Sequence, residues 1–173
     1  MNTIKTTLTT EAVFSDDSLK RYLLKKTWDP NKARLAIIML APSGASGIEL
    51  DTTTQLVLNN ASRLGYGSVS ITNLFATLND FSLKMAEADD KENLKIILQE
   101  AEATDTIIYA AGVGKSKVKI FQKRQEQVLR ALLPYEAKLN CLCNASGQAR
   151  LQHPLSPVVH TWHLSPLKVS ELI

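Results

Sequence analysis

The sequence predicts an α/β protein whose parallel sheet lies between two layers of helices. Short apolar segments alternate with longer segments of helical periodicity, as expected when parallel strands are joined by right-handed helical crossovers. The clearest apolar segment, residues 35–40, is long enough for a strand buried on both faces and too short to span a membrane. We therefore expect a three-layer α/β/α fold with a four-stranded parallel core sheet and an N-terminal β-hairpin.

Turn residues and periodicity define the expected elements. Asp51 or Thr52 is the expected N-cap of the first helix, and Gly65 marks its end. Pro134 closes the last long helix. In chain order we expect hairpin strands at 12–14 and 22–24 around a turn at 15–18, a strand at 35–40, a helix at 52–64, a strand at 68–72, a long loop through 79–81, a helix at 92–103, a strand at 106–111, a helix at 115–133, a strand at 139–143 and a polar loop at 144–157.

The same elements predict one domain over residues 1–173. Residues 1–33 form the N-terminal hairpin extension, residues 34–157 the core, and residues 158–173 a C-terminal edge segment. We expect this last segment to contain an edge strand and a terminal helical turn.

Composition excludes several classes of protein. The chain is 45% hydrophobic with a net charge of +3, lacks an apolar stretch of 18 residues, and does not begin with a signal peptide, so we expect a cytoplasmic protein with no membrane contact. Cys141 and Cys143 alternate along an apolar strand and predict two buried thiols rather than a zinc site. His160 and His163 have no third ligand near them in sequence. We expect neither a metal nor a cofactor.

Basic residues gather in the third predicted helix. A solvated helix face and a phosphate-binding patch both account for such a run. The run contains one acid, Glu126, among Lys115, Lys117, Lys119, Lys123, Arg124 and Arg130.

Candidate functional residues follow the four core strands, because the carboxyl ends of parallel strands meet at one edge of a sheet. Asn73 ends the second strand, where its amide could pair with a nucleobase edge or merely turn the chain. His153 precedes Pro154, which holds its backbone extended; it is either a site residue or an ordinary loop histidine.

The other strand ends carry weaker signals. Gly112 and Lys115 frame a Gly-rich turn that matches neither the P-loop nor the dinucleotide fingerprint, and could still contact a phosphate. Ser43 lacks the G-x-S-x-G context of a hydrolase nucleophile. Asp51 is either a helix cap or an acid/base group.

Short motifs occur almost from end to end of the chain: Ala12-Val-Phe-Ser15, Lys20-Arg-Tyr-Leu23, Trp28-Asp29, Ile38-Met-Leu-Ala-Pro-Ser43, Asp51-x-Thr53, Gly65-Tyr-Gly67, Asn73-Leu-Phe-Ala76, Glu92-Asn93, Ala110-Ala-Gly112 and His153-Pro-Leu155. By these motifs the chain resembles the bacterial and viral family catalogued as domain of unknown function 1643. That family name implies no activity.

The order of the motifs is also similar, more distantly, to that of the uracil-DNA glycosylase superfamily. By that resemblance Asn73 would bind a base edge, His153 would stabilise the departing base, and the loops holding Pro42 and Pro154 would grip phosphates. The candidate catalytic residues are His153, by that resemblance, and Asp51, by its place as a carboxylate in the first loop. The candidate binding residues are Pro42, Ser43, Asn73, Phe75, Gly112, Lys115, Pro154 and Ser156.

One departure from the glycosylase pattern divides the functional hypotheses. Glycosylases of this type position water with a polar residue before the first-loop proline, where this chain has Ala41. Either Asp51 substitutes, or the protein binds without cutting. We therefore expect a protein that recognises a base in DNA, RNA or a nucleotide and that, if active, hydrolyses an N-glycosidic bond. The alternative is a non-catalytic protein-interaction module on the same scaffold.

Overall fold

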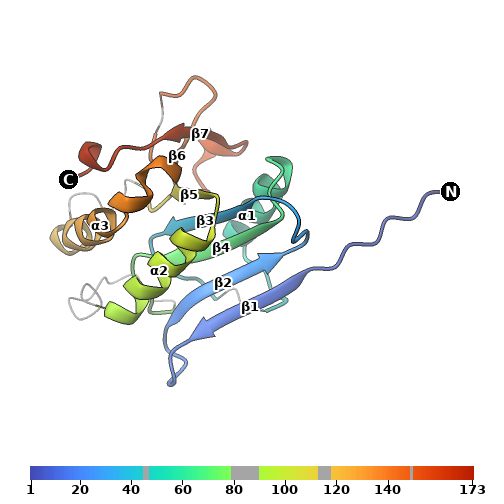
Figure 1. Ribbon diagram of the computed structural model, residues 1–173, viewed down its shortest axis with the longest axis horizontal. Helices are drawn as coiled ribbons and strands as arrows, with labels where there is room; N and C mark the ends of the chain where they lie inside the picture. Colours follow the sequence, from blue (N-terminus) through green and yellow to red (C-terminus); the bar gives the residue numbers. More distant parts are fainter. Residues whose placement is uncertain (45–46, 79–89, 113–117, 149) are drawn as a thin grey trace.

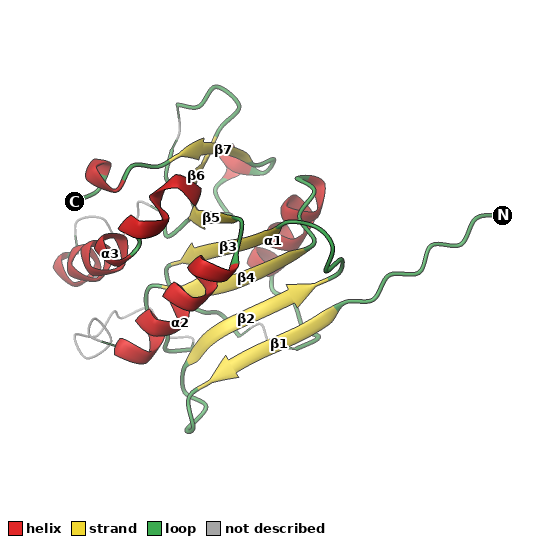
Figure 2. Cartoon of the chain, viewed as in Figure 1, coloured by secondary structure: helices red, strands yellow, loops and turns green. Residues whose placement is uncertain are grey.

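The structure, a computed structural model, describes residues 1–44, 47–78, 90–112, 118–148 and 150–173. Within these residues the chain forms one seven-stranded mixed sheet with helices packed against it (Figures 1 and 2). The strand order across the sheet is β1-β2-β4-β3-β5-β6-β7. The strands are β1 (Thr9–Phe14), β2 (Arg21–Thr27), β3 (Arg34–Met39), β4 (Ser68–Asn73), β5 (Thr106–Tyr109), β6 (Leu139–Cys143) and β7 (His163–Pro166).

The predicted α/β class is confirmed, and the sheet is larger and more mixed than the expected four-stranded core. Strands β4, β3, β5 and β6 pair in parallel. The β1–β2 hairpin joins antiparallel to β4, and β7 joins antiparallel to β6. The N-terminal hairpin and the C-terminal edge strand therefore extend the same sheet at opposite edges.

The helices lie close to their predicted positions: α1 spans Thr52–Arg63, α2 spans Lys91–Ala103 and α3 spans Lys119–Ala131. The expected start of the third helix falls in residues 113–117, outside the described residues. Helix α3 ends before Pro134, which instead lies near the start of a 3-10 turn at Leu133–Lys138. A proline is tolerated there because the first turn of a helix leaves its N–H groups without helical partners.

Side chains alternate along the strands and so build two apolar clusters, one on each face of the sheet. The first cluster joins Ala36 and Ile38 of β3 to residues of α2 and α3. The second joins Leu35, Ile37 and Met39 of β3 to residues of α1. Helices α2 and α3 thus cover one face and α1 the other (Figure 1).

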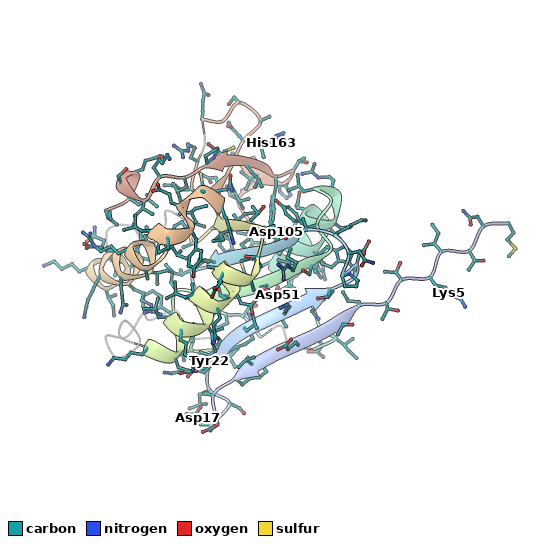
Figure 3. All side chains as sticks on the ribbon, in the orientation of Figure 1. Lys5, Asp17, Tyr22, Asp51, Asp105 and His163 are labelled. Atoms are coloured by element: carbon teal, nitrogen blue, oxygen red, sulfur yellow. The ribbon has the colours of Figure 1, made fainter. Side chains whose placement is uncertain are left out.

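Residues 1–8 run away from the body of the protein, beyond the start of β1 (Figure 1). Lys5 lies on this extended segment, and Asp17 lies at the turn of the hairpin (Figure 3). The turn forms as predicted: Ser15 Oγ donates to Asp17 at 2.6 Å, and the Ser18 N–H donates to Ser15 O at 2.9 Å. In the described part of the chain, no helix is both long and apolar enough to cross a membrane.

Candidate functional site

The carboxyl ends of β3 and β4, the start of α1 and the loop after β6 meet at one edge of the sheet. Asn73 is the last residue of β4 and pairs in register with Met39, the last residue of β3. Its side chain therefore lies on the α1 face, with Met39. Ser43 follows β3 and bonds to Asp51, the N-cap of α1.

Arg21 joins this group, and the sequence analysis did not select it. Arg21 is 2% exposed, and its Nη1 donates to Ser43 O at 3.3 Å. Burial lowers the pKa of Arg21, and the negative charge of Asp51 opposes that shift. Arg21, which is buried, and Ser43 and Asp51, which are half-buried, thus form a polar group beside the first turn of α1.

A β-bulge places Arg21 on this face. Pairing between β1 and β2 shifts register at Phe14, which lies opposite Arg21 and leaves Tyr22 as the extra residue. Further along β2, Lys25 pairs with Glu100 of α2, so odd-numbered positions there face α2. At the bulge this parity reverses, because Tyr22 lies beside α2 while Arg21 reaches Ser43. Bulges often redirect a side chain in this way near functional sites.

Asp51 caps α1 as the sequence predicted. Its carboxylate accepts the Thr54 N–H at 2.6 Å and also accepts the hydroxyl of Ser43. Burial raises the pKa of this carboxyl, but the hydrogen bonds from Ser43 and Thr54 and the charge of Arg21 outweigh it, so the net shift is downward. A lowered pKa means that the folded protein favours the ionised carboxylate.

Replacing Asp51 by asparagine should therefore destabilise the protein in a pH-dependent way. Asparagine caps helices as well as aspartate does, so the change removes mainly the charge. The pKa of Asp51 is lowered on folding, so its charge stabilises the native state above the unfolded-state pKa of about 3.9. That contribution is lost as the pH falls through the folded-state pKa.

Urea denaturation of wild type and Asp51→Asn between pH 7 and pH 2 measures this difference. We expect wild type to be the more stable protein at pH 7 and the two curves to converge at the acid end. A difference that does not change with pH would mean that Asp51 acts only as a cap. Asp51→Ala, which also removes the cap, should cost about 1 kcal/mol more than Asp51→Asn.

His153 lies against the end of β5. The backbone of Gly112 has a φ of +75°, and a Cβ added there would lie 3.2 Å from the Cβ of His153. Nδ1 of His153 accepts the N–H of Leu155 at 3.2 Å, which leaves Nε2 to carry the proton of the neutral ring. Burial lowers the pKa of His153 while Asp51 opposes the shift, so the ring is neutral at pH 7.

Asn73 stands out among the polar side chains of this edge. It is 1% exposed, and within the described residues neither its Oδ1 nor its Nδ2 has a hydrogen-bond partner. Leaving a buried donor or acceptor without a partner costs about 1–3 kcal/mol. Such groups are rare in native proteins and call for a reason.

The remaining predicted residues have varied surroundings. Pro42 and Pro154 are buried, and Ser156 Oγ donates to Gln152 Oε1 at 2.7 Å within the loop after β6. Phe75 is 0% exposed and packs in the apolar cluster on the α2 and α3 face, away from Asn73. Lys115 and Lys117 lie outside the described residues.

One member of the basic run has a structural role instead of the solvated or phosphate-facing role predicted from sequence. Arg124 is 0% exposed, and its Nε donates to Leu74 O at 2.8 Å. The helical spacing indicates this role, because Arg124 shares the buried face of α3 with Phe121 and Val128. Lys119 is exposed at the start of α3, and Arg130 pairs with Glu126 across one turn.

The two cysteines are free and buried, as predicted. Cys143 Sγ contacts His163 O at 3.4 Å across the β6–β7 pair. Among the described residues, no three histidine, cysteine, aspartate or glutamate side chains are grouped to hold a metal ion.

The fold and this edge together define a mixed α/β protein with a partly buried polar group at the carboxyl ends of its parallel strands. Residues 21–155 match the model of a family described as "Protein of unknown function (DUF1643)". The match spans most of the chain, so the protein belongs to this family, and the resemblance of its sequence motifs to this same family is confirmed. No curated protein and no solved structure matches the chain significantly.

Proposed function

We propose that this protein recognises a nucleobase, in DNA, RNA or a free nucleotide, at the edge where Asn73 and His153 lie. In this proposal the protein has a three-layer α/β/α core like that of the uracil-DNA glycosylases. If the protein is catalytic, the reaction is hydrolysis of the N-glycosidic bond that joins base and sugar.

The buried amide of Asn73 is the observation that carries the proposal. With one donor and one acceptor group, an asparagine side chain matches the adjacent donor and acceptor atoms on the edge of a base. A bound base would supply both missing hydrogen bonds. This accounts for a polar side chain that is 1% exposed and has no partner among the described residues.

His153 adds a second donor of fixed tautomer. Because Nδ1 accepts the N–H of Leu155, the Nε2–H is the donor that a ligand can use. A neutral imidazole donor suits a carbonyl oxygen, including one on which negative charge develops as a base departs. Its lowered pKa favours the neutral form.

The charges of Arg21, Asp51 and His153 favour an uncharged base rather than a phosphate as the ligand beside them. The positive charge of Arg21 faces the negative charge of Asp51, and His153 is neutral at pH 7. The group therefore has no excess positive charge to attract an anion. Phosphates would be held further out on the same edge.

Asp51 is the candidate for positioning water in a hydrolytic reaction. Ala41 offers no polar atom before Pro42, whereas the Asp51 carboxylate is ionised and close enough to His153 to influence its pKa. General-base groups contribute about 10²–10⁴-fold to rate. Asp51→Asn should reduce any base release by a factor in that range.

Binding and base release on short oligonucleotides test the proposal. Single-stranded and duplex probes, each with one labelled uracil or other base, are titrated at low salt, where even non-specific binding is strong. Released base is then measured by chromatography. The variants are Asn73→Ala and His153→Ala, with matched controls at exposed positions of the same residue types, Asn59→Ala and His160→Ala.

We expect binding that falls at least about tenfold with each site variant and stays unchanged with each control. Failure of the wild type to bind any oligonucleotide or nucleotide at low salt would overturn the proposal. Binding without base release would make the protein a base-recognising module rather than an enzyme. A cellular function that survives both site variants would favour the protein-interaction alternative.

A further inference from the structure

The peptide groups that follow Asn73 are held from the opposite face of the sheet. Asn93 lies in the first turn of α2 and is 0% exposed. Its Nδ2 donates to Asn73 O at 3.0 Å and to Leu74 O at 3.1 Å. Arg124 of α3 donates through Nε to the same Leu74 O at 2.8 Å. Three hydrogen bonds from two helices thus converge on two successive carbonyls.

The backbone of Asn93 and the guanidinium of Arg124 both bond to Asp90, the N-cap of α2. Asp90 accepts the backbone N–H of Asn93 at 3.0 Å and the ammonium of Lys20 at 2.7 Å. The Nη2 of Arg124 approaches Asp90 O at 3.4 Å. The group therefore links the hairpin, α2 and α3 to the end of β4.

The N–H groups of the same segment are fixed from β3. The Leu74 N–H donates to Met39 O at 2.8 Å, and the Phe75 N–H donates to Leu40 O at 3.0 Å. With its C=O and N–H both hydrogen-bonded, the Asn73–Leu74 peptide is restrained on both sides. These contacts fix the Cα–Cβ bond of Asn73, from which its amide turns only about χ1 and χ2.

We propose that Asn93 and Arg124 are positioning residues, which orient the Asn73 amide toward the ligand by holding the carbonyls of Asn73 and Leu74. This inference rests on the proposed function, in which Asn73 binds the base edge. Neither residue touches the ligand, because both lie on the α2 and α3 face whereas the Asn73 side chain lies on the α1 face. The positioning role of Asn93 also gives the Glu92-Asn93 motif a physical function.

The first test needs no ligand. The side-chain amide signals of Asn73 are assigned in a ¹⁵N–¹H NMR spectrum by their loss in Asn73→Leu, and are then compared between wild type and Asn93→Ala. Ile97→Ala is the matched control, because Ile97 is a buried residue of the same helix in the apolar cluster. We expect the Asn73 signals to move in Asn93→Ala and to stay in place in Ile97→Ala. Unmoved signals in Asn93→Ala, or equal movement in both variants, would overturn the inference.

The second test asks whether Asn93 acts through Asn73, with a single-stranded oligonucleotide containing one uracil as the probe. Misplacing a contacting group by about 1 Å can reduce its effect up to 100-fold. When Asn73 is present, Asn93→Ala should therefore weaken oligonucleotide binding by about 10- to 100-fold. In the Asn73→Leu background the same change should have no further effect. An equal loss in both backgrounds would mean that Asn93 only supports the fold.

Two features keep these tests decisive. If Asn93→Ala does not fold, Arg124→Lys takes its place: it keeps the charge, loses the Nε donor to Leu74 O, and should move the same NMR signals. If wild type binds no oligonucleotide, the proposed function fails while the ligand-free spectra still decide whether Asn93 and Arg124 set the orientation of Asn73.

Discussion

Replacing Asn73 by leucine should stabilise the protein, whereas the same replacement at Asn93 should destabilise it. Leucine branches at Cγ as asparagine does, so each change removes the polar atoms, and the same increase in volume accompanies it at both positions. At Asn73 it removes two buried atoms that have no partner among the described residues. At Asn93 it removes the donor to Asn73 O and Leu74 O. We expect a gain of about 1–3 kcal/mol at Asn73 and a loss of about 2 kcal/mol at Asn93.

Thermal and urea denaturation of the two variants give these free energies directly. For a chain of this length, 1 kcal/mol corresponds to about 2–4 °C in Tm, so the two variants should melt on opposite sides of wild type. Asn73→Leu should at the same time lose ligand binding. A residue that costs stability and is needed for binding has the energetic pattern of a functional site. Equal destabilisation by both variants would show that Asn73 is an ordinary core residue.

Much of the fold was predictable because its signals are local. Apolar runs gave the strands, Asp51 gave the start of α1, and Gly65, with a φ of +89°, gave its end. Parallel strand ends must meet at one edge, so the proximity of Ser43 to the end of β4 also followed from topology. These inferences need only the chain itself and the geometry of βαβ units.

The residues that the sequence analysis missed depend on long-range packing. Arg21 faces Ser43 because β2 has a bulge where it pairs with β1. The residue types of the hairpin do not predict that bulge. Asn93 was treated only as part of a family motif, although it lies on the same helix face as the buried Ile97. Arg124 was assigned by its charge, and its place on the apolar face of α3 was the better guide. Buried polar residues are hard to predict because a sequence shows the group but not its partner.

The connection between β2 and β3 explains a further part of the family motif Gly65-Tyr-Gly67. The Gly67 carbonyl accepts the N–H groups of Trp28 and Asp29 at 2.9 and 3.0 Å, and its own N–H donates to Ala33 O at 2.8 Å. This close backbone contact joins the connection that follows the hairpin to the turn before β4. It thereby holds in place the hairpin that carries Arg21.

Gly67→Ala should therefore be strongly destabilising, by at least about 3 kcal/mol. A Cβ at this position would lie 1.9 Å from Asp29 O and 2.8 Å from the Cβ of Lys32, and a backbone oxygen cannot rotate away as a side chain can. Gly65→Ala is the matched control, because Gly65 has a φ of +89° and open space around it. That change should cost only the backbone strain of about 1–2 kcal/mol. Urea denaturation of the two variants ranks them, and amide exchange at Trp28 and Asp29 should accelerate in Gly67→Ala alone. If Gly65→Ala proves as damaging as Gly67→Ala, backbone conformation rather than close packing is what this motif requires.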